Sequence, residues 1–376
     1  MKKNLIILFI LLIVPFFILS QVVSTPDSST ISNWKMTGSF LLKTGQYPES
    51  VIYLDSVLDI SPFDRQVRLT KAEAFFRMGN YNLSKHELDF LLQLNKNDTT
   101  AIFKRVLVNI QLGDYQAALS DANNYTDIKP GDAYGWYYKG YIFKNRVPSK
   151  PVTVTVKTSY KKAIKNLEKA IEINGGQFYE AFVVLGNIYK NLDERDNALD
   201  NYRKAIAADS NQGLPYMNIG EMQLSGKDTA AALASFYKAI DVNPEDQYTI
   251  TQVNKYLVRL GIYDQALSIF DRWINDDSTS LNGWLGKGSV YLQQKKFTES
   301  LACFDKAVSY HPGTAAVYYY HGLANIGLGE KKAGKEDLRL AAELGNAAAR
   351  KYLETDLRYS ESWLPFLFGL LKQLPK

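Results

Sequence analysis

The stretch YEAFVVLGNIYKNLDERDNALDNYRKAIAADS, residues 179–210, decides the fold of this 376-residue chain. Apolar residues recur every three to four positions in its two halves, which indicates two amphipathic helices. The polar run NLDERD separates them and is short enough to be a turn. The stretch therefore predicts a helical hairpin.

The same pattern recurs along the chain in a 34-residue frame. It is seen again in LPYMNIGEMQLSGKDTAAALASFYKAIDVNP (214–244) and in NGWLGKGSVYLQQKKFTESLACFDKAVSYHP (282–312). A repeat of this length indicates a solenoid of stacked helical hairpins. Nine units cover residues 31–348 and begin at Ile31, Arg65, Thr99, Ala133, Tyr179, Gly213, Gln247, Leu281 and Ala315.

Small side chains recur at two positions of the unit. The first helix carries glycine in six of nine units. A second position is small in all nine, twelve residues later in eight units and 23 residues later in the longer fourth unit. Glycine inside a helix destabilises it by about 1 kcal/mol relative to alanine, so its recurrence indicates closely packed helices. The first position holds Gly38, Gly140, Gly186, Gly220, Gly288 and Gly322, and the second Ser50, Ser84, Ala118, Ala163, Ala198, Ala232, Ala266, Ser300 and Gly334.

This pattern resembles the tetratricopeptide repeat, whose signature is an aromatic residue, Leu-Gly and Tyr, and later Ala, Phe, Ala and Pro. The resemblance covers about 318 of the 376 residues. It implies an all-α fold, a right-handed superhelical solenoid of about nine helical hairpins with a C-terminal capping helix. Val106 and Asn254 replace the small first-helix residue in two units, so we expect looser or re-angled packing there.

The two ends of the chain lie outside the repeats. Residues 1–20 carry two basic residues, Lys2 and Lys3, followed by an apolar run over 5–19. This run is shorter than the ~17–25 residues of a membrane-spanning helix. We expect a cleaved signal peptide or a retained N-terminal anchor, followed by a linker over 21–30. The protein would then be exported, periplasmic or secreted if the segment is cleaved and membrane-anchored if it is retained.

At the other end, residues 349–376 are expected to form a capping helix and an apolar tail. The tail, SWLPFLFGLLKQLP (362–375), has three interpretations. It packs back on the last repeats, binds a partner, or lies on a membrane surface.

Catalytic and metal-binding patterns are not found. Cys303 is the single cysteine and lies in an apolar helical run, which indicates a buried, unreactive thiol. His86 lacks the second histidine of a zinc-protease helix. The net charge of +5 is dispersed, unlike the clustered basic face of a nucleic-acid-binding protein. We expect no enzymatic activity, cofactor, metal or nucleic-acid partner.

In the family that this chain resembles, first helices line a concave groove in which peptides lie. The richest stretch on that side is YGWYYKGYIF (134–143), whose tyrosines combine apolar area with a hydroxyl. The alternative is that these rings only pack on neighbouring helices. The candidate groove residues are Tyr134, Tyr137, Tyr141, Asn187, Lys190, Met217, Glu221, Tyr248, Lys255 and Tyr319.

One subclass of the family holds acidic C-terminal peptides in a clamp of basic and asparagine residues. Asn187 and Asn218 fall in two clamp positions, whereas Val183, Tyr248 and Gln252 occupy positions where basic residues are needed. We therefore expect no such clamp.

The stretch KNRVPSKPVTVTVKTS (144–159) interrupts the fourth unit. We expect an insertion over 145–159, with the second helix resuming at Tyr160. VTVTV alternates with a period of two, the pattern of an exposed strand. The insertion is either a tolerated loop or an appendage that binds a partner.

Three functions remain open on the sequence. The first is a protein-protein interaction scaffold that binds a protein or peptide in its groove and helps to assemble an envelope complex. The second is an exported holding chaperone or folding factor. The third is a subunit of a secretion or motility apparatus.

Overall fold

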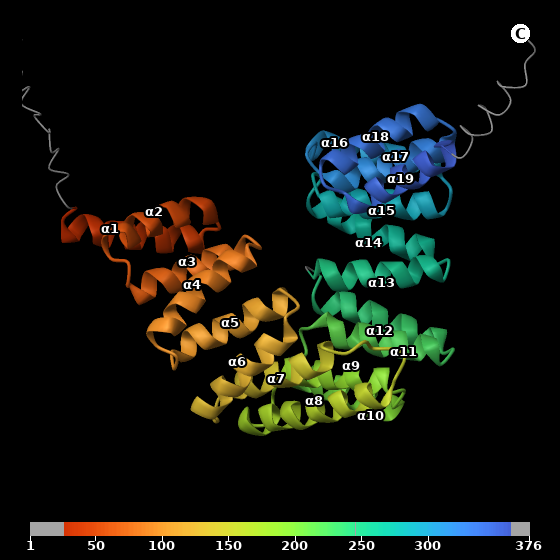
Figure 1. The fold of residues 1–376 in the computed structure, drawn as a ribbon. Coiled ribbons are helices and arrows are strands. Elements are labelled where there is room, and N and C mark those ends of the chain that lie inside the picture. Colours follow the sequence, from red (N-terminus) through yellow and green to blue (C-terminus); the bar gives the residue numbers. More distant parts are fainter. Residues whose placement is uncertain (1–25, 245, 362–376) are drawn as a thin grey trace, which may run out of the picture. The chain divides into compact units, whose positions relative to one another are not determined.

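The computed structural model describes residues 26–244 and 246–361, which contain α-helices and no strand. Figure 1 shows the helices as successive hairpins. The chain divides into two compact units between Leu192 and Asp193. The fold is an all-α solenoid, as the repeats predict.

The first unit holds nine helices in its described residues. They are α1 (Ser28–Lys43), α2 (Tyr47–Ile60), α3 (Arg65–Arg77), α4 (Tyr81–Leu94), α5 (Thr99–Gln111), α6 (Tyr115–Ile128), α7 (Ala133–Asn145), α8 (Val154–Ile173) and α9 (Tyr179–Asn191). Each helix packs on the next, and first helices of neighbouring hairpins also meet, as α1 does with α3, and α7 with α5 and α9. First helices therefore line one side of this unit.

The second unit holds ten helices in its described residues. They are α10 (Arg195–Ala208), α11 (Gly213–Ser225), α12 (Thr229–Val242), α13 (Gln247–Arg259), α14 (Tyr263–Asp276), α15 (Leu281–Gln293), α16 (Phe297–Tyr310), α17 (Ala315–Leu328), α18 (Lys331–Glu343) and α19 (Ala347–Glu361). Here α13 contacts both α11 and α15, so first helices again meet. The last helix, α19, packs on α18 and buries Ala349 beside Leu338 and Ala341.

Local sequence signals explain where the helices begin and end. Asp98 caps α5 by accepting hydrogen bonds from the backbone N–H groups of Thr100 and Ala101. Aspartates play the same part before α1, α3, α6, α7, α12 and α13. The turn inside a hairpin needs a left-handed residue, which is glycine at Gly79 and Gly113.

The close packing predicted for the two small positions is confirmed. The hydroxyl of Ser84 on α4 donates to the backbone carbonyl of Ala72 on α3 at 2.7 Å. Ser50 makes the same bond to Gly38 at 2.7 Å, and Ser300 to Gly288 at 2.8 Å. A β-carbon on Gly140 would lie only 2.6 Å from Cγ of Leu167. Small side chains are therefore required where the two helices of a hairpin cross.

Two expected boundaries differ from the structure. The linker predicted over 21–30 ends earlier, because α1 begins at Ser28 behind the cap of Asp27. The strand pattern in VTVTV was misleading. Thr153 caps α8, which begins at Val154, so the loop between α7 and α8 covers only 146–153.

The proposed N-terminal signal or anchor (1–20) and the apolar tail (362–375) lie outside the described residues. Within 26–244 and 246–361, no helix combines the length and apolar character needed to cross a membrane.

Candidate partner-binding surface

Five aromatic rings gather on and beside α7, and we call them the aromatic cluster: Tyr134, Tyr137, Tyr138, Tyr141 and Phe178. The Phe178 ring centroid lies 5.1 Å from that of Tyr134 and 5.3 Å from that of Tyr137. Tyr137 also contacts Tyr141, with centroids 6.2 Å apart. Helical spacing places the tyrosines on one side of α7, and the chain entering α9 brings Phe178 against them.

The cluster has an ordered base and an exposed edge. Phe178 is buried, Tyr137 and Tyr141 are half-buried, and 47% of the Tyr134 surface is exposed. Burial, and then the neighbouring tyrosines, raise the pKa of Tyr137 well above its usual range. The hydroxyl therefore stays protonated at neutral pH and can donate a hydrogen bond.

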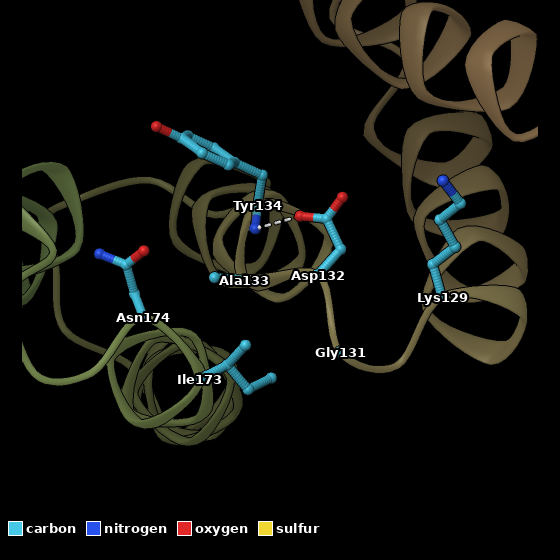
Figure 2. A pocket seen from close by; sticks show the side chains of 7 residues that line it. All are labelled: Lys129, Gly131, Asp132, Ala133, Tyr134, Ile173 and Asn174. Atoms are coloured by element: carbon cyan, nitrogen blue, oxygen red, sulfur yellow. Dashed lines mark hydrogen bonds between the residues drawn. The ribbon is translucent and has the colours of Figure 1, made fainter.

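An open pocket of about 500 Å³ adjoins Tyr134. Figure 2 shows Tyr134 and Asp132 at the start of α7, Ile173 and Asn174 at the end of α8, and Lys129 across the Gly131 loop. Asp132 accepts hydrogen bonds from Tyr134 N–H at 2.9 Å and from the Tyr125 hydroxyl at 2.6 Å. The entry into α7 is thus held firmly, and polar residues line the pocket next to Tyr134.

Basic groups continue this surface toward the end of α7. The Lys144 ammonium donates to Oδ1 of Asn145 at 3.0 Å. Burial lowers the pKa of Lys144, and the charge of Lys190 lowers it further. The end of α7 therefore brings two ammonium groups near one another. Asn187, on the same helix as Lys190, is half-buried.

The candidate residues of the second unit are dispersed over three helices. On α13, Tyr248 is 63% exposed and Lys255 is exposed as well. Glu221 on α11 accepts a hydrogen bond from Tyr256, whose pKa burial and then Glu221 raise to about 12. Tyr319 is half-buried against the core formed by α18 and α19.

Met217 does not fit the expectation of a groove residue. Only 6% of its surface is exposed, and it lies in the core with Phe236 and Ile240. Met217 lies on a first helix, α11, as predicted, but its side chain packs in the core with side chains of α12. The clamp positions Asn218 and Val183 are also buried, so their side chains are not open to a peptide.

Two members of the cluster were missed in the sequence. Tyr138 lies four residues after Tyr134 and three before Tyr141, a spacing that could have revealed it. Phe178 carried no such signal, because it precedes α9 and reaches the tyrosines only through the packing of α9 on α7.

Cys303 and His321, two side chains that could take part in catalysis, are buried or paired with other residues of the fold. Within the described residues, no three His, Cys, Asp or Glu side chains converge as metal ligands would. Cys303 is buried, and burial raises its pKa to about 11, so the thiol is protonated at neutral pH. His321 lies between Asp337 at 2.9 Å and Asp305 at 3.2 Å.

Comparison with known families agrees with this architecture. Tetratricopeptide-repeat models match residues 69–133, 179–212, 215–246 and 285–352, more than half of the chain. The chain belongs to the tetratricopeptide-repeat family. Members of this family act as protein-interaction scaffolds, so this tetratricopeptide-repeat protein has the fold of a protein-binding module.

Individual relatives are distant. A TPR repeat-containing protein of Methanocaldococcus jannaschii is 22% identical over 81% of this chain and 55% of its own length. RNA polymerase II-associated protein 3 of Xenopus tropicalis is 25% identical over 50% of this chain and 30% of its own. This chain thus spans about half or less of the length of these curated relatives.

Among solved structures, a tetratricopeptide repeat protein from Parabacteroides merdae aligns with a TM-score of 0.50. It is 14% identical over 79% of this chain and 99% of its own length. At this low sequence identity, the similarity shows that the two proteins share a fold.

Proposed function

We propose that this protein is a non-enzymatic scaffold that binds a protein or peptide segment at the aromatic cluster. The observation that carries the proposal is the half-exposed Tyr134 ring on a base of Phe178 and Tyr137, beside an open pocket. A rigid aromatic ring offers a large contact area and loses little conformational entropy when a partner covers it. Residues of this kind dominate the binding energy of protein interfaces.

The proposal includes export and a role in assembling an envelope complex. The export part is supported by the Lys-Lys start and the apolar run over residues 5–19. Fractionation of cells that express the full chain tests export, and sequencing of the mature N-terminus shows whether residues 1–20 are removed. Recovery of the intact chain in the cytoplasmic fraction would contradict this part.

The binding site is tested with Tyr134→Ala in the full chain. The partner is captured from the compartment in which the protein resides, identified by crosslinking, and measured with purified components. We expect Tyr134→Ala to weaken binding by at least about tenfold, as for an interface anchor.

Tyr310→Ala is the matched control. Tyr310 is also an exposed tyrosine, but it ends α16, a second helix, and lies outside the aromatic cluster. The Tyr310→Ala variant should bind the partner as tightly as the wild type does. Equal binding by wild type and Tyr134→Ala would refute the site.

An exported holding chaperone is the second candidate. Met36 and Phe40 lie one turn apart on α1 and are largely exposed, as is Ile52 on α2. Exposed apolar side chains of this kind can hold unfolded clients. Suppression of aggregation of several unrelated substrates, lost in the double variant Met36→Ser and Phe40→Ser, would favour the chaperone over a scaffold with one partner.

A further inference from the structure

A basic side chain recurs one residue before the small position of the first helix. It is Lys71 on α3, Arg105 on α5, Lys139 on α7, Lys287 on α15 and His321 on α17. This position lies between the second helix of its own hairpin and that of the preceding hairpin. A half-buried charge at such a place requires a counter-ion.

The protein supplies these counter-ions in a regular way. Lys71 contacts Asp55 at 2.7 Å and Glu87 at 2.8 Å. Arg105 contacts Asp89 at 2.7 Å and Asp121 at 2.6 Å. The acids come from the second helix of the preceding hairpin and from that of the same hairpin, respectively.

The same arrangement continues in the second unit. His321 lies between Asp305 and Asp337. Lys287 contacts Asp271 from the preceding hairpin at 2.5 Å, and Cys303 takes the second acidic position. Each of these four basic groups has at least one carboxylate partner.

Lys139 is the exception within the described residues. The two acidic positions hold Asn123 on α6 and Asn166 on α8. Lys139 donates to Oγ1 of Thr126 at 3.2 Å, and its ammonium lies 4.5 Å from the centroid of the Trp136 ring. No ion pair to a carboxylate is found for it among residues 26–244 and 246–361.

The electrostatics agree with this geometry. Burial lowers the pKa of Lys139, while the more distant Asp127 acts in the opposite direction. In contrast, the carboxylate partners of Lys71 and Arg105 raise the pKa values of these groups despite their burial. A carboxylate placed beside Lys139 would stabilise its charged form in the same way.

The space for such a group exists. Lys139, Trp136 and Phe143 line an open pocket of about 730 Å³ between α6, α7 and α8. One side of α8 adds Lys162, Lys165 and Lys169, against the two glutamates Glu168 and Glu172. Lys169 is already paired with Glu172 at 2.9 Å. The remaining charged groups of the pocket are three lysines and one glutamate, so its net charge is positive.

We propose that this pocket binds an acidic peptide segment of a partner protein. An Asp or Glu of the segment lies between Asn123 and Asn166 and pairs with Lys139, in place of the carboxylates that other hairpins supply internally. Asn166 already donates one amide N–H to the backbone carbonyl of Lys162 at 2.7 Å. An asparagine amide has two N–H groups, so Asn123 and Asn166 can each donate to an incoming carboxylate, whereas aspartate would repel it. Trp136 and Phe143 accept apolar side chains next to the acid.

The site is separate from the aromatic cluster. Successive helical residues are rotated by about 100°, so positions two residues apart face nearly opposite directions. Trp136, Lys139 and Phe143 therefore lie on the other side of α7 from Tyr134, Tyr137 and Tyr141. If binding at the aromatic cluster is refuted, the proposal for the Lys139 pocket can still hold, and the reverse is also true.

The test uses the full chain and a short fluorescein-labelled peptide of alternating Glu and Leu. Fluorescence anisotropy should show saturable binding that weakens as salt is added. The same peptide with Gln in place of Glu should bind at least about tenfold more weakly.

Two variants separate the site from general electrostatic attraction. Lys139→Met removes the charge but retains an apolar side chain. The double variant Asn123→Asp and Asn166→Asp supplies internal counter-ions, as at Arg105. Both should bind the Glu peptide at least about tenfold more weakly, and the double variant should melt at the same temperature as the wild type or higher. Tyr134→Ala should bind the peptide as the wild type does.

Any of four results would overturn the proposal: no binding to the wild type up to about 1 mM peptide, equal binding of the Glu and Gln peptides, unchanged binding by both variants, or displacement by inorganic phosphate as readily as by unlabelled Glu peptide. The last result would indicate a general anion site.

Discussion

A β-carbon built on Gly322 of α17 would lie 2.8 Å from the backbone carbonyl oxygen of Gly334 on α18. In the other direction, a β-carbon on Gly334 would lie 2.6 Å from the carbonyl of Gly322. Both distances are shorter than van der Waals contact, so the two backbones touch where these helices cross.

Gly322→Ala should push α17 and α18 apart. Because the obstacle is backbone and not a flexible side chain, we expect the free energy of unfolding to fall by about 1–3 kcal/mol. Chemical denaturation measures the loss, and hydrogen exchange should locate it in α17 and α18. Gly313→Ala is the control, because a β-carbon there meets nothing within 4 Å. Equal stability of the two variants would show that the close crossing is not required.

Asn254 on α13 occupies the position that the other first helices fill with glycine, alanine or, on α5, Val106. It is 4% exposed, and neither polar atom of its side chain has a hydrogen-bond partner among the described residues. Leaving such a group buried costs about 1–3 kcal/mol. Asn254→Ala should therefore raise the free energy of unfolding by about 1 kcal/mol or more.

Asn325→Ala provides the opposite case in the same measurement. The amide of Asn325 is also buried, but it donates to Oδ2 of Asp337 at 2.9 Å. Its removal should destabilise the protein. A loss of stability in Asn254→Ala would mean that its amide has a partner in solution.

His321 should make stability depend on pH. Its hydrogen bond to Asp337, and then the Asp305 contact, raise its pKa above the ordinary value of 6.5 despite burial. The protonated form therefore stabilises the folded state. This contribution is complete below the unfolded-state pKa and is lost as pH rises through the folded-state pKa.

The measurement is the free energy of unfolding of wild type minus that of His321→Gln, followed between about pH 5.5 and pH 8. The difference should be largest at the acidic end and should decline as pH rises. His86→Gln is a control at an exposed position. A difference that is constant over this range would rule out a stabilising imidazolium at residue 321.

The start of α8 should contribute to stability. Val156 is 2% exposed, while Val154, two residues earlier, is 82% exposed. Val156→Ala should lower the free energy of unfolding by about 1–3 kcal/mol, through lost burial and the cavity left behind. Val154→Ala should change it by less than about 0.5 kcal/mol. If the two variants are equally stable, the first turn of α8 is not packed in solution.

The repeating seam was predictable because it depends on positions within one hairpin. Gly38 and Ser50 are twelve residues apart, and their contact follows from helix period and turn length alone. The start of α8 was not predictable in this way. Its alternating Val-Thr pattern favours a strand, but Ser159 donates to the backbone carbonyl of Phe143 at 2.6 Å and ties this segment to α7 as a helix.

The candidate site shows the same division. Helical spacing placed Tyr134, Tyr137 and Tyr141 together, since all three lie on one helix. The same spacing placed Met217 on the groove side, yet the core of the second unit encloses it. Exposure depends on how neighbouring hairpins cover a helix, and that depends on side chains distant in the sequence.

By itself, the sequence determined the all-α repeat, the turns and the small-residue seam, because each depends on interactions within about 34 residues. Only the tertiary structure decided which polar groups meet. It joined Arg105 to both Asp89 and Asp121 and left Lys139 facing Asn123 and Asn166. The physical reason is that these side chains come from different helices of adjacent hairpins, and only their packing brings charges within range.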